Sequence, residues 1–447
     1  MEYSSDLETF LIPTSSGTIL YAPLSGVLLF LEGELREWSS ETLAPILAKY
    51  AAKTDYPVTY PANSSLSPPF LGIIPTRACN LRCRYCAFED SSDTLDTLDI
   101  PTALMAVRWF SDICSREGRA SLDIEFFGGE PMVCPDLVHA VALSSWESSV
   151  ARTMTTNLRI ITNGVCPPAS RQLMADLFAK VILSLDGPPE IHNRLRPFAS
   201  GNGSFDHVAK TARIVGDGQA DLSLRVCVTD ETAHRMGEIA SFFIDNFCPS
   251  EVSFEPLSAN DMTGQSNLSP PDPISFAQGF FEAESVLGPA GIPLVHATSS
   301  IEHRQVSFCP VGRDGAIVGP GGRLFACYLC PKEWERRGLE LAFGRFDGAG
   351  QLLTDETRLS RIRTLNVTTK KRCQSCFVKW HCAGGCHVNH TYPGCDDRPD
   401  DLCTITRTIA LKRLLDTLEL PEESRSFAAS PYDPRERCLR VEAHTDE

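Results

Sequence analysis

The hydrophobic residues between positions 70 and 287 follow two alternating patterns. Short apolar runs of strand length each precede a longer segment with apolar residues at helical spacing. The predicted strands are residues 70–75, 122–127, 158–162, 181–185, 222–229 and 252–257. The predicted helices are residues 101–115, 135–147, 170–179, 206–215, 232–246 and 273–287. Six successive strand–helix units predict an α/β fold with a parallel sheet and outer helices, curled as a partial (β/α)6 TIM-like barrel.

The segments on either side of this array have other patterns. Short β-type runs at 9–13 and 18–31 and a helical pattern at 40–52 predict a short N-terminal α+β module, and the Pro- and Ser-rich residues 56–69 predict a linker. This module either recognises a peptide or adds a layer to the next domain. After residue 300 cysteine, glycine and short turns dominate, which predicts a small cysteine-rich C-terminal domain held by metal, with one helix at 406–418.

These patterns together predict four segments. They are an N-terminal module at 1–66, the barrel at 67–300, the cysteine-rich domain at 301–420 and a flexible, charged tail at 421–447.

The composition of the chain limits the classes of partner that it can bind. The chain has 447 residues, 43% hydrophobic residues and a net charge of −16, which argues against binding nucleic acid or an anionic membrane surface. The sequence has no apolar run long enough to span a bilayer, and its acidic N-terminus lacks the pattern of an export signal. We therefore expect a cytoplasmic protein that acts on a small molecule, a peptide or a protein.

The chain has eighteen cysteines, and their spacing along the sequence says more about their role than their number does. In a large chain without an export signal, grouped cysteines indicate metal or cluster binding rather than disulfides. We expect ordinary thiols at the scattered positions Cys114, Cys134, Cys166, Cys227, Cys248, Cys395 and Cys438. A group of three, Cys79-x3-Cys83-x2-Cys86, follows the first predicted strand. If these three thiolates hold a 4Fe-4S cluster, one iron has no protein ligand and is open to a small molecule.

This motif, with the aromatic Tyr85 before its last cysteine, resembles that of the radical S-adenosylmethionine (radical SAM) enzymes. The resemblance implies a 4Fe-4S cluster on Cys79, Cys83 and Cys86 whose open iron is chelated by S-adenosylmethionine. It also implies reductive cleavage of the sulfonium to a 5′-deoxyadenosyl radical. The alternative for the motif alone is a zinc or structural iron site that lacks its fourth ligand.

The end of the second predicted strand resembles a second motif of the same family. Gly128 and Gly129 permit close backbone approach, and the carboxylate of Glu130 suits a cation. The resemblance implies that this segment receives the methionyl ammonium group. The alternative is a plain strand-to-helix turn.

Three further positions are weaker candidates by the same resemblance. Ser184 and Asp186, at the end of the fourth strand, are candidates for contacts to the ribose or methionyl part, and Arg225 is a candidate for the methionine carboxylate. Each of the first two could instead cap the following helix. His192 and Arg196, in the same loop, are expected to be solvated.

The C-terminal cysteines resemble the seven-cysteine pattern of the SPASM extension. The pattern comprises Cys309, Cys327, Cys373, Cys376, Cys382, Cys386 and Cys403. The resemblance implies two auxiliary 4Fe-4S clusters, one on Cys373, Cys376, Cys382 and Cys403 and the other on Cys309, Cys327 and Cys386. The sequence does not decide the fourth ligand of the cluster on Cys309, Cys327 and Cys386. It could be Cys330 or a substrate group, or the iron could have no fourth ligand. A zinc ribbon is the alternative for the whole pattern.

The resemblance also bears on the reaction. Sulfatase-maturing relatives have an aspartate, thought to act as a base, where this chain has Tyr328, which weakens that activity for this chain. The expected function is hydrogen abstraction from a peptide or protein, installing a crosslink or an oxidation in the maturation of a ribosomally made peptide. A flavodoxin or ferredoxin is the implied reductant, and no catalytic base is assigned. The alternatives are formylglycine formation in a sulfatase and, in another class, a non-catalytic zinc or iron–sulfur protein.

Overall fold

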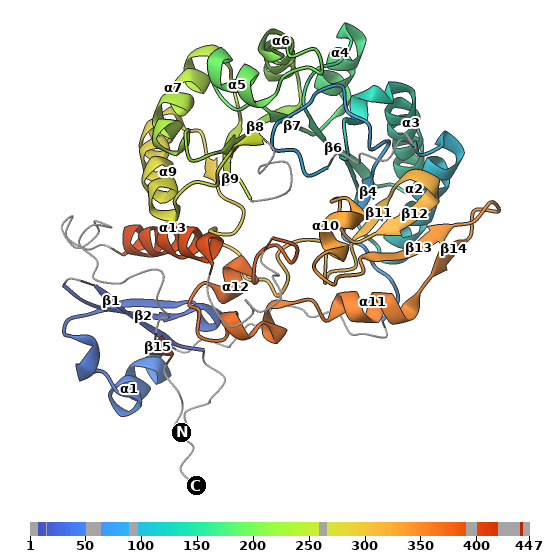
Figure 1. Ribbon diagram of the computed structural model, residues 1–447. Coiled ribbons are helices and arrows are strands. Elements are labelled where there is room, and N and C mark those ends of the chain that lie inside the picture. Colours follow the sequence, from blue (N-terminus) through green and yellow to red (C-terminus); the bar gives the residue numbers. More distant parts are fainter. Residues whose placement is uncertain are drawn as a thin grey trace. The chain divides into compact units, whose positions relative to one another are not determined.

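The computed structural model describes residues 8–14, 16–50, 64–88, 97–258, 266–389, 400–418 and 439–440. The chain divides into two compact units, each built from segments that are distant in the sequence (Figure 1). The larger unit comprises residues 60–296 and 309–364, and the smaller comprises residues 1–59, 297–308 and 365–447.

The larger unit is built on a parallel sheet. Its central strands are β4 (Leu71–Ile73), β5 (Ser121–Phe126), β6 (Thr155–Thr162), β7 (Lys180–Ser184), β8 (Asp221–Val228) and β9 (Glu251–Pro256). Each of these strands pairs in parallel with the next in the sequence, and β10 (Leu294–Val295) continues the parallel order beyond β9. The six predicted strands and their parallel order are confirmed.

Helices cover the outer face of this sheet (Figure 1). They are α2 (Ile100–Arg116), α3 (Pro135–Ala151), α4 (Pro168–Leu177), α5 (Pro189–Leu195), α6 (Phe205–Gly216), α7 (Met236–Asn246) and α9 (Pro273–Leu287). Proline at the first turn of most of them fits the helix start, where its missing N–H is not needed. The predicted partial (β/α)6 barrel is therefore the observed fold.

The alternation within β5 decides which side chains face the helices. Leu122, Ile124 and Phe126 are buried, while Asp123 and Glu125 between them are partly exposed. Because successive residues of a strand point to opposite faces, the apolar set packs under the helices and the acidic set faces the concave side.

The sheet extends further than the sequence predicted. β11 (Ala316–Val318) pairs in parallel with β4, and β12 (Arg323–Phe325), β13 (Ala342–Phe346) and β14 (Leu352–Thr354) follow it in antiparallel order. The helices α10 (Pro331–Glu335) and α11 (Glu356–Arg363) belong to the same segment. The sequence interpretation did not include these four strands, because strands of three to five residues leave little periodicity in the sequence.

The smaller unit has an antiparallel sheet in the order β15-β1-β2-β3. The strands are β1 (Phe10–Thr14), β2 (Gly17–Ala22), β3 (Val27–Leu31) and β15 (Leu439–Arg440). α1 (Ser40–Tyr50), α12 (Lys379–Cys382) and α13 (Asp401–Thr417) complete the unit. Phe10 and Ile12 of β1 form one buried cluster with Phe377 and with Leu411 and Leu414 of α13. The N-terminal strands therefore share a hydrophobic core with the C-terminal segment.

Helix α13 begins five residues earlier than the predicted start at Thr406. The Asp400 side chain accepts a hydrogen bond from the backbone N–H of Cys403 (2.9 Å) and caps the helix. The prediction missed this first turn because it contains few apolar residues. None of the helices within the described part of the chain is long and apolar enough to cross a membrane.

Candidate cluster-binding sites

The loop after β4 carries the three cysteines predicted for the first cluster, Cys79, Cys83 and Cys86. This loop is tied down by its backbone. The N–H of Arg82 donates to the carbonyl of Pro197 (2.8 Å), and the N–H of Arg84 donates to that of Leu195 (2.9 Å). The loop is thereby fixed to the segment that follows β7, at the carboxyl ends of the parallel strands.

Each of the three sulfur atoms accepts an N–H hydrogen bond. The donors are the Asn163 side chain to Cys79 (3.5 Å), the Arg196 guanidinium to Cys83 (3.9 Å) and the Phe88 backbone to Cys86 (3.4 Å). N–H donors directed at cysteine sulfur favour the thiolate form. Such hydrogen bonds also help to set the reduction potential of an iron–sulfur cluster.

Of these three thiols, Cys83 is buried, and Cys79 and Cys86 are partly exposed. Burial, together with Glu130 and Cys86, raises the pKa of the Cys79 thiol to about 11. Burial also raises the pKa of Cys83, against the effect of Arg196, and the neighbouring Cys86 and Cys79 raise it further. Thiols whose pKa values are raised in this way lose their protons when a bound cation offsets the negative charge, and an iron–sulfur cluster supplies such a cation. The residues present therefore fit the predicted group.

The segment Gly128-Gly129 lies directly against the chain that enters the cysteine loop. The N–H of Gly129 donates to the carbonyl of Thr76 (3.0 Å), and a Cβ on Gly129 would lie 2.5 Å from the carbonyl oxygen of Arg77. Gly128 has a positive φ of 143°. Glycine is therefore needed at position 129 for the close contact and is favoured at position 128 by the positive φ.

Glu130 is buried, and its carboxylate accepts three hydrogen bonds. They come from the N–H of Met132 (2.9 Å), the hydroxyl of Thr162 (2.7 Å) and the N–H of Asn163 (2.7 Å). Burial raises the pKa of Glu130 to about 7, against the effect of these donors. Glu130 thus joins the end of β5 to the end of β6, and its contact to a methionyl ammonium group stays a prediction.

Asp186 is the centre of a second buried network. Its carboxylate accepts hydrogen bonds from the Tyr85 hydroxyl (2.7 Å), from Nε of Arg196 (2.8 Å) and from the N–H of Cys227 (3.0 Å). Arg196 also lies over the ring of Tyr85, 5.2 Å from its centroid. The carboxylate therefore connects the cysteine loop, the end of β7 and strand β8. Its predicted contact to S-adenosylmethionine stays a prediction.

The expectation that His192 and Arg196 are solvated was wrong. His192 is fully buried and Arg196 is 8% exposed. Nδ1 of His192 accepts the N–H of Asp186 (3.2 Å), and burial lowers the pKa of His192 to about 4, so that the ring is neutral at pH 7. The signal in the sequence was the position of both residues within ten residues of Asp186, in one loop.

Ser184 and Arg225 lie side by side on neighbouring strands. Ser184 is the last residue of β7 and pairs in register with Arg225 of β8. Ser184 is half-buried, and Arg225 is exposed. The register therefore places these two candidates next to each other, while their contacts to S-adenosylmethionine stay predictions.

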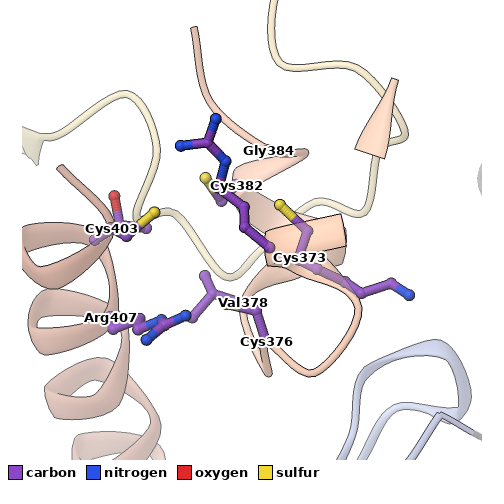
Figure 2. Close-up of a pocket in the computed structure, with 10 residues that line it drawn as sticks. Cys373, Cys376, Val378, Cys382, Gly384, Cys403 and Arg407 are labelled. Carbon is purple, nitrogen blue, oxygen red and sulfur yellow. The ribbon is translucent and has the colours of Figure 1, made fainter. Parts of the chain in front are cut away.

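The structure brings together four of the C-terminal cysteines in the smaller unit. Cys373, Cys376, Cys382 and Cys403 line one pocket with about 350 Å³ of empty space, part of which is open to solvent. Figure 2 shows Cys403 on α13, facing the loop that carries the other three. No three His, Cys, Asp or Glu side chains among the described residues are grouped as ligands of a single metal ion. A donor set of four thiols around one space fits the predicted 4Fe-4S cluster.

Basic side chains line the same pocket, and the sequence interpretation did not include them. They are Arg372, Lys379 and Arg407, which are 4%, 6% and 2% exposed. Burial and the nearby Cys376 raise the pKa of Cys373 to about 11, while Lys370, Arg372 and Arg407 each act to lower it. The cations are therefore close enough to stabilise negative charge on the cysteines.

The cysteines predicted for the other auxiliary cluster belong to both units. Cys309 and Cys327 are in the larger unit and Cys386 is in the smaller, and their grouping stays a prediction. The Cys330 thiol, a candidate fourth ligand, is fully buried and donates to the carbonyl of Phe88 (3.0 Å), two residues after Cys86. The structure thus places Cys330 against the loop of the first cysteine group.

Comparison with protein families gives one match. Residues 73–243 match the family model of the Radical SAM superfamily. This range contains the first cysteine group, the segment Gly128-Gly129 and the strands β5 to β8.

Two curated relatives are similar over most of the chain. A cysteine-type anaerobic sulfatase-maturating enzyme of Clostridium perfringens is 22% identical over 69% of this chain and 85% of its own length. A serine-type anaerobic sulfatase-maturating enzyme of Klebsiella aerogenes is 22% identical over 70% of this chain and 78% of its own length.

Two solved structures share the fold. The structure of anSMEcpe with bound AdoMet has a TM-score of 0.58 at 18% identity, over 78% of this chain and 99% of that one. Streptococcus suis SuiB bound to S-adenosylmethionine has a TM-score of 0.52 at 15% identity, over 87% of this chain and 97% of that one. Other structures of the two proteins hold peptides, Cp18Cys in anSMEcpe and the precursor peptide SuiA in SuiB.

Proposed function

The chain carries a radical SAM domain, a member of the Radical SAM superfamily, and from this premise we propose that it is a peptide- or protein-modifying radical SAM enzyme with auxiliary iron–sulfur clusters. One observation carries the proposal. Three cysteines of one loop lie at the carboxyl ends of a parallel sheet, each sulfur with an N–H donor, beside the glycine segment 128–129. Three thiolates leave one iron of a 4Fe-4S cluster free for S-adenosylmethionine.

When bound and reduced, the cluster and S-adenosylmethionine supply a 5′-deoxyadenosyl radical that abstracts a hydrogen atom from the substrate. The chain's own residues hold the cysteine loop in position. The Asp186 carboxylate joins Tyr85 of the cysteine loop to strand β8, and the Glu130 carboxylate joins the segment after β5 to the end of β6. The glycine segment lets the backbone approach the loop closely. Residues that are locked in this way hold a reactive group in one orientation.

A peptide or protein is the substrate class that the comparisons favour. Structures of two proteins that share the fold hold peptides, and the two curated relatives are named for the maturation of sulfatases. Within this class we propose the installation of a crosslink or an oxidation in a ribosomally made peptide, with a flavodoxin or ferredoxin as the reductant.

Formylglycine formation in a sulfatase is the second candidate, and the names of the relatives favour it. Tyr328 argues against it. Its hydroxyl donates to the backbone carbonyl of Glu125 (3.4 Å), and burial raises its pKa well above the ordinary value. A phenol in this state does not accept a proton at neutral pH.

The test is cleavage of S-adenosylmethionine by the anaerobically reconstituted chain with dithionite. We expect 5′-deoxyadenosine from the wild type and from the control Cys248→Ala, which changes an exposed thiol, but none from Cys83→Ala. Zinc in place of iron, with no 5′-deoxyadenosine, would contradict the proposal. Adding a sulfatase peptide separates the candidates, since an aldehyde product detected by mass spectrometry would favour formylglycine formation.

A further inference from the structure

Three basic side chains, Arg372, Lys379 and Arg407, line the pocket of Cys373, Cys376, Cys382 and Cys403 without being predicted ligands of iron. We propose that Arg407 and Arg372 are positioning residues that raise the reduction potential of the auxiliary cluster, so that this cluster takes up an electron readily. The inference rests on the proposed function, because it requires a cluster on these four cysteines.

The first argument is the geometry of α13. Cys403 and Arg407 are four residues apart in this helix, so their side chains lie on the same face, one turn from each other. Both line the pocket, and Figure 2 shows both facing the loop of Cys373 and Cys382. The helix that supplies one predicted ligand therefore also supplies a cation at a fixed distance from it.

The second argument is burial. Arg407 is among the largest side chains of the chain that are fully buried, at 2% exposure, and Arg372 is 4% exposed. A guanidinium stays protonated at any pH that proteins tolerate, so its charge remains in the pocket. In a buried site with little water, such a charge acts on its neighbours with little screening.

The third argument is that the cations are held in place. Arg372 forms an ion pair with Asp400, the residue that caps α13 (3.4 Å). Nζ of Lys370 donates to the carbonyl of Gly384 (2.6 Å), two residues after Cys382. These contacts hold both cations near Cys373, whose pKa both act to lower, and Arg372 lines the pocket itself.

The consequence follows from charge alone. One-electron reduction adds a negative charge to the cluster without forming or breaking a bond, and nearby cations stabilise the reduced form. Reduction potentials of such clusters depend on the surrounding charge, the hydrogen bonds to sulfur and solvent exposure. Removal of one cation should therefore make the cluster harder to reduce.

The experiment is a redox titration of the full-length reconstituted chain with dithionite as the electron donor, followed by electron paramagnetic resonance. The auxiliary couple is identified as the signal that Cys403→Ala removes. We expect Arg407→Gln to retain iron and to shift the reduction equilibrium about tenfold toward the oxidised form, which is ~59 mV for one electron. We expect Arg407→Lys, which keeps the charge, to restore most of the wild-type potential.

A matched control is available on the same helix. Lys412 pairs with Asp416 (2.5 Å) on the surface of α13, so Lys412→Gln removes the same charge away from the pocket and should leave the potential unchanged. If Arg407→Gln loses iron, Arg372→Gln serves as the second variant, with the same expected shift.

The outcomes separate the two proposals. Wild-type potentials in Arg407→Gln, or an equal shift in Lys412→Gln, would overturn the inference. Loss of iron in both arginine variants would assign the cations to cluster assembly and would also overturn it. If Cys403→Ala removes no signal from the wild-type spectrum, the four-cysteine cluster of the proposed function is absent, which is a different failure.

Discussion

The cysteine loop of the larger unit and the cysteine pocket of the smaller unit differ in the charges around the sulfur atoms. Beside Cys79 and Cys83 lie the buried carboxylates of Glu130 and Asp186, with Arg196 as the cation. The pocket of the smaller unit is lined by three basic side chains, of which Arg372 pairs with Asp400 (3.4 Å) and Lys379 with Glu8 (2.5 Å), and Arg407 is the third. Carboxylates near a cluster disfavour its reduction, whereas cations favour it.

This difference suits different tasks. A cluster that must donate an electron to a bound sulfonium needs a low potential, and the acidic surroundings of the first site serve this need. A cluster that accepts the electron of a substrate radical, left after hydrogen abstraction, needs a higher potential. The tasks proposed for the two sites require opposite directions of electron transfer, and the following predictions test the contrast between the sites.

The largest expected effect is on iron content. Joint replacement of Cys79, Cys83 and Cys86 by Ala should lower the iron by about four atoms per chain, and so should joint replacement of the four pocket cysteines. Each site supplies its own ligands within one unit, so the two losses should be independent. Iron and sulfide analysis measures this, and loss of all the iron in either variant would contradict separate sites.

The second-largest expected effect is a loss of unfolding free energy when the buried ion pair beside the first site is broken. Asp186→Asn removes the partner of Arg196, a pair whose side chains are 0% and 10% exposed. Leaving a buried guanidinium without its carboxylate costs about 3–5 kcal/mol of unfolding free energy. Urea denaturation measures it.

Glu238→Gln is the control, because its ion pair with Arg235 has side-chain exposures of 52% and 29% and should be worth about 1 kcal/mol or less. Equal losses in the two variants would contradict the importance of the buried network.

A smaller loss of stability, with a large effect on activity, is expected at Gly129. In Gly129→Ala the added Cβ meets backbone carbonyl oxygens that cannot move without the cysteine loop, at a cost of about 1–3 kcal/mol. Displacing the loop should reduce S-adenosylmethionine cleavage roughly a hundredfold. Gly288→Ala, with no atom within 4 Å of the new Cβ, should leave the rate of 5′-deoxyadenosine formation unchanged.

The smallest effect is expected at Tyr85. Tyr85→Phe removes one of three donors to the Asp186 carboxylate and should cost about 1 kcal/mol of unfolding free energy, since Arg196 and the Cys227 backbone remain. The same urea series measures it. A loss as large as that in Asp186→Asn would mean that the hydroxyl, rather than the ion pair, holds the loop.

The sequence predicted the barrel because its strands are apolar runs bounded by turn residues, and each bound agrees with the structure to within a few residues. The short strands β11 to β14 were missed because three to five residues carry too little periodicity. The shared core of β1 and α13 was missed as well, since no local pattern reports packing between residues 10 and 411.

In the candidate sites, too, the sequence predicted what lies close together along the chain and missed contacts between distant residues. Spacing alone grouped Cys79, Cys83 and Cys86, because ligands within one loop are close in the sequence. It did not find Arg196 as a partner of Cys83, because that contact joins residues 113 apart. The predicted helix start at Thr406 also excluded Cys403 from α13 and concealed its i,i+4 relation to Arg407.

The most direct measurement of the central claim compares S-adenosylmethionine cleavage in Cys83→Ala and Cys403→Ala, under dithionite and without a substrate. If the two sites have separate tasks, Cys83→Ala forms no 5′-deoxyadenosine, while Cys403→Ala still forms it, because radical formation needs only the first site. Cleavage by Cys83→Ala, or its complete loss in a folded Cys403→Ala that retains the iron of its other clusters, would contradict the account.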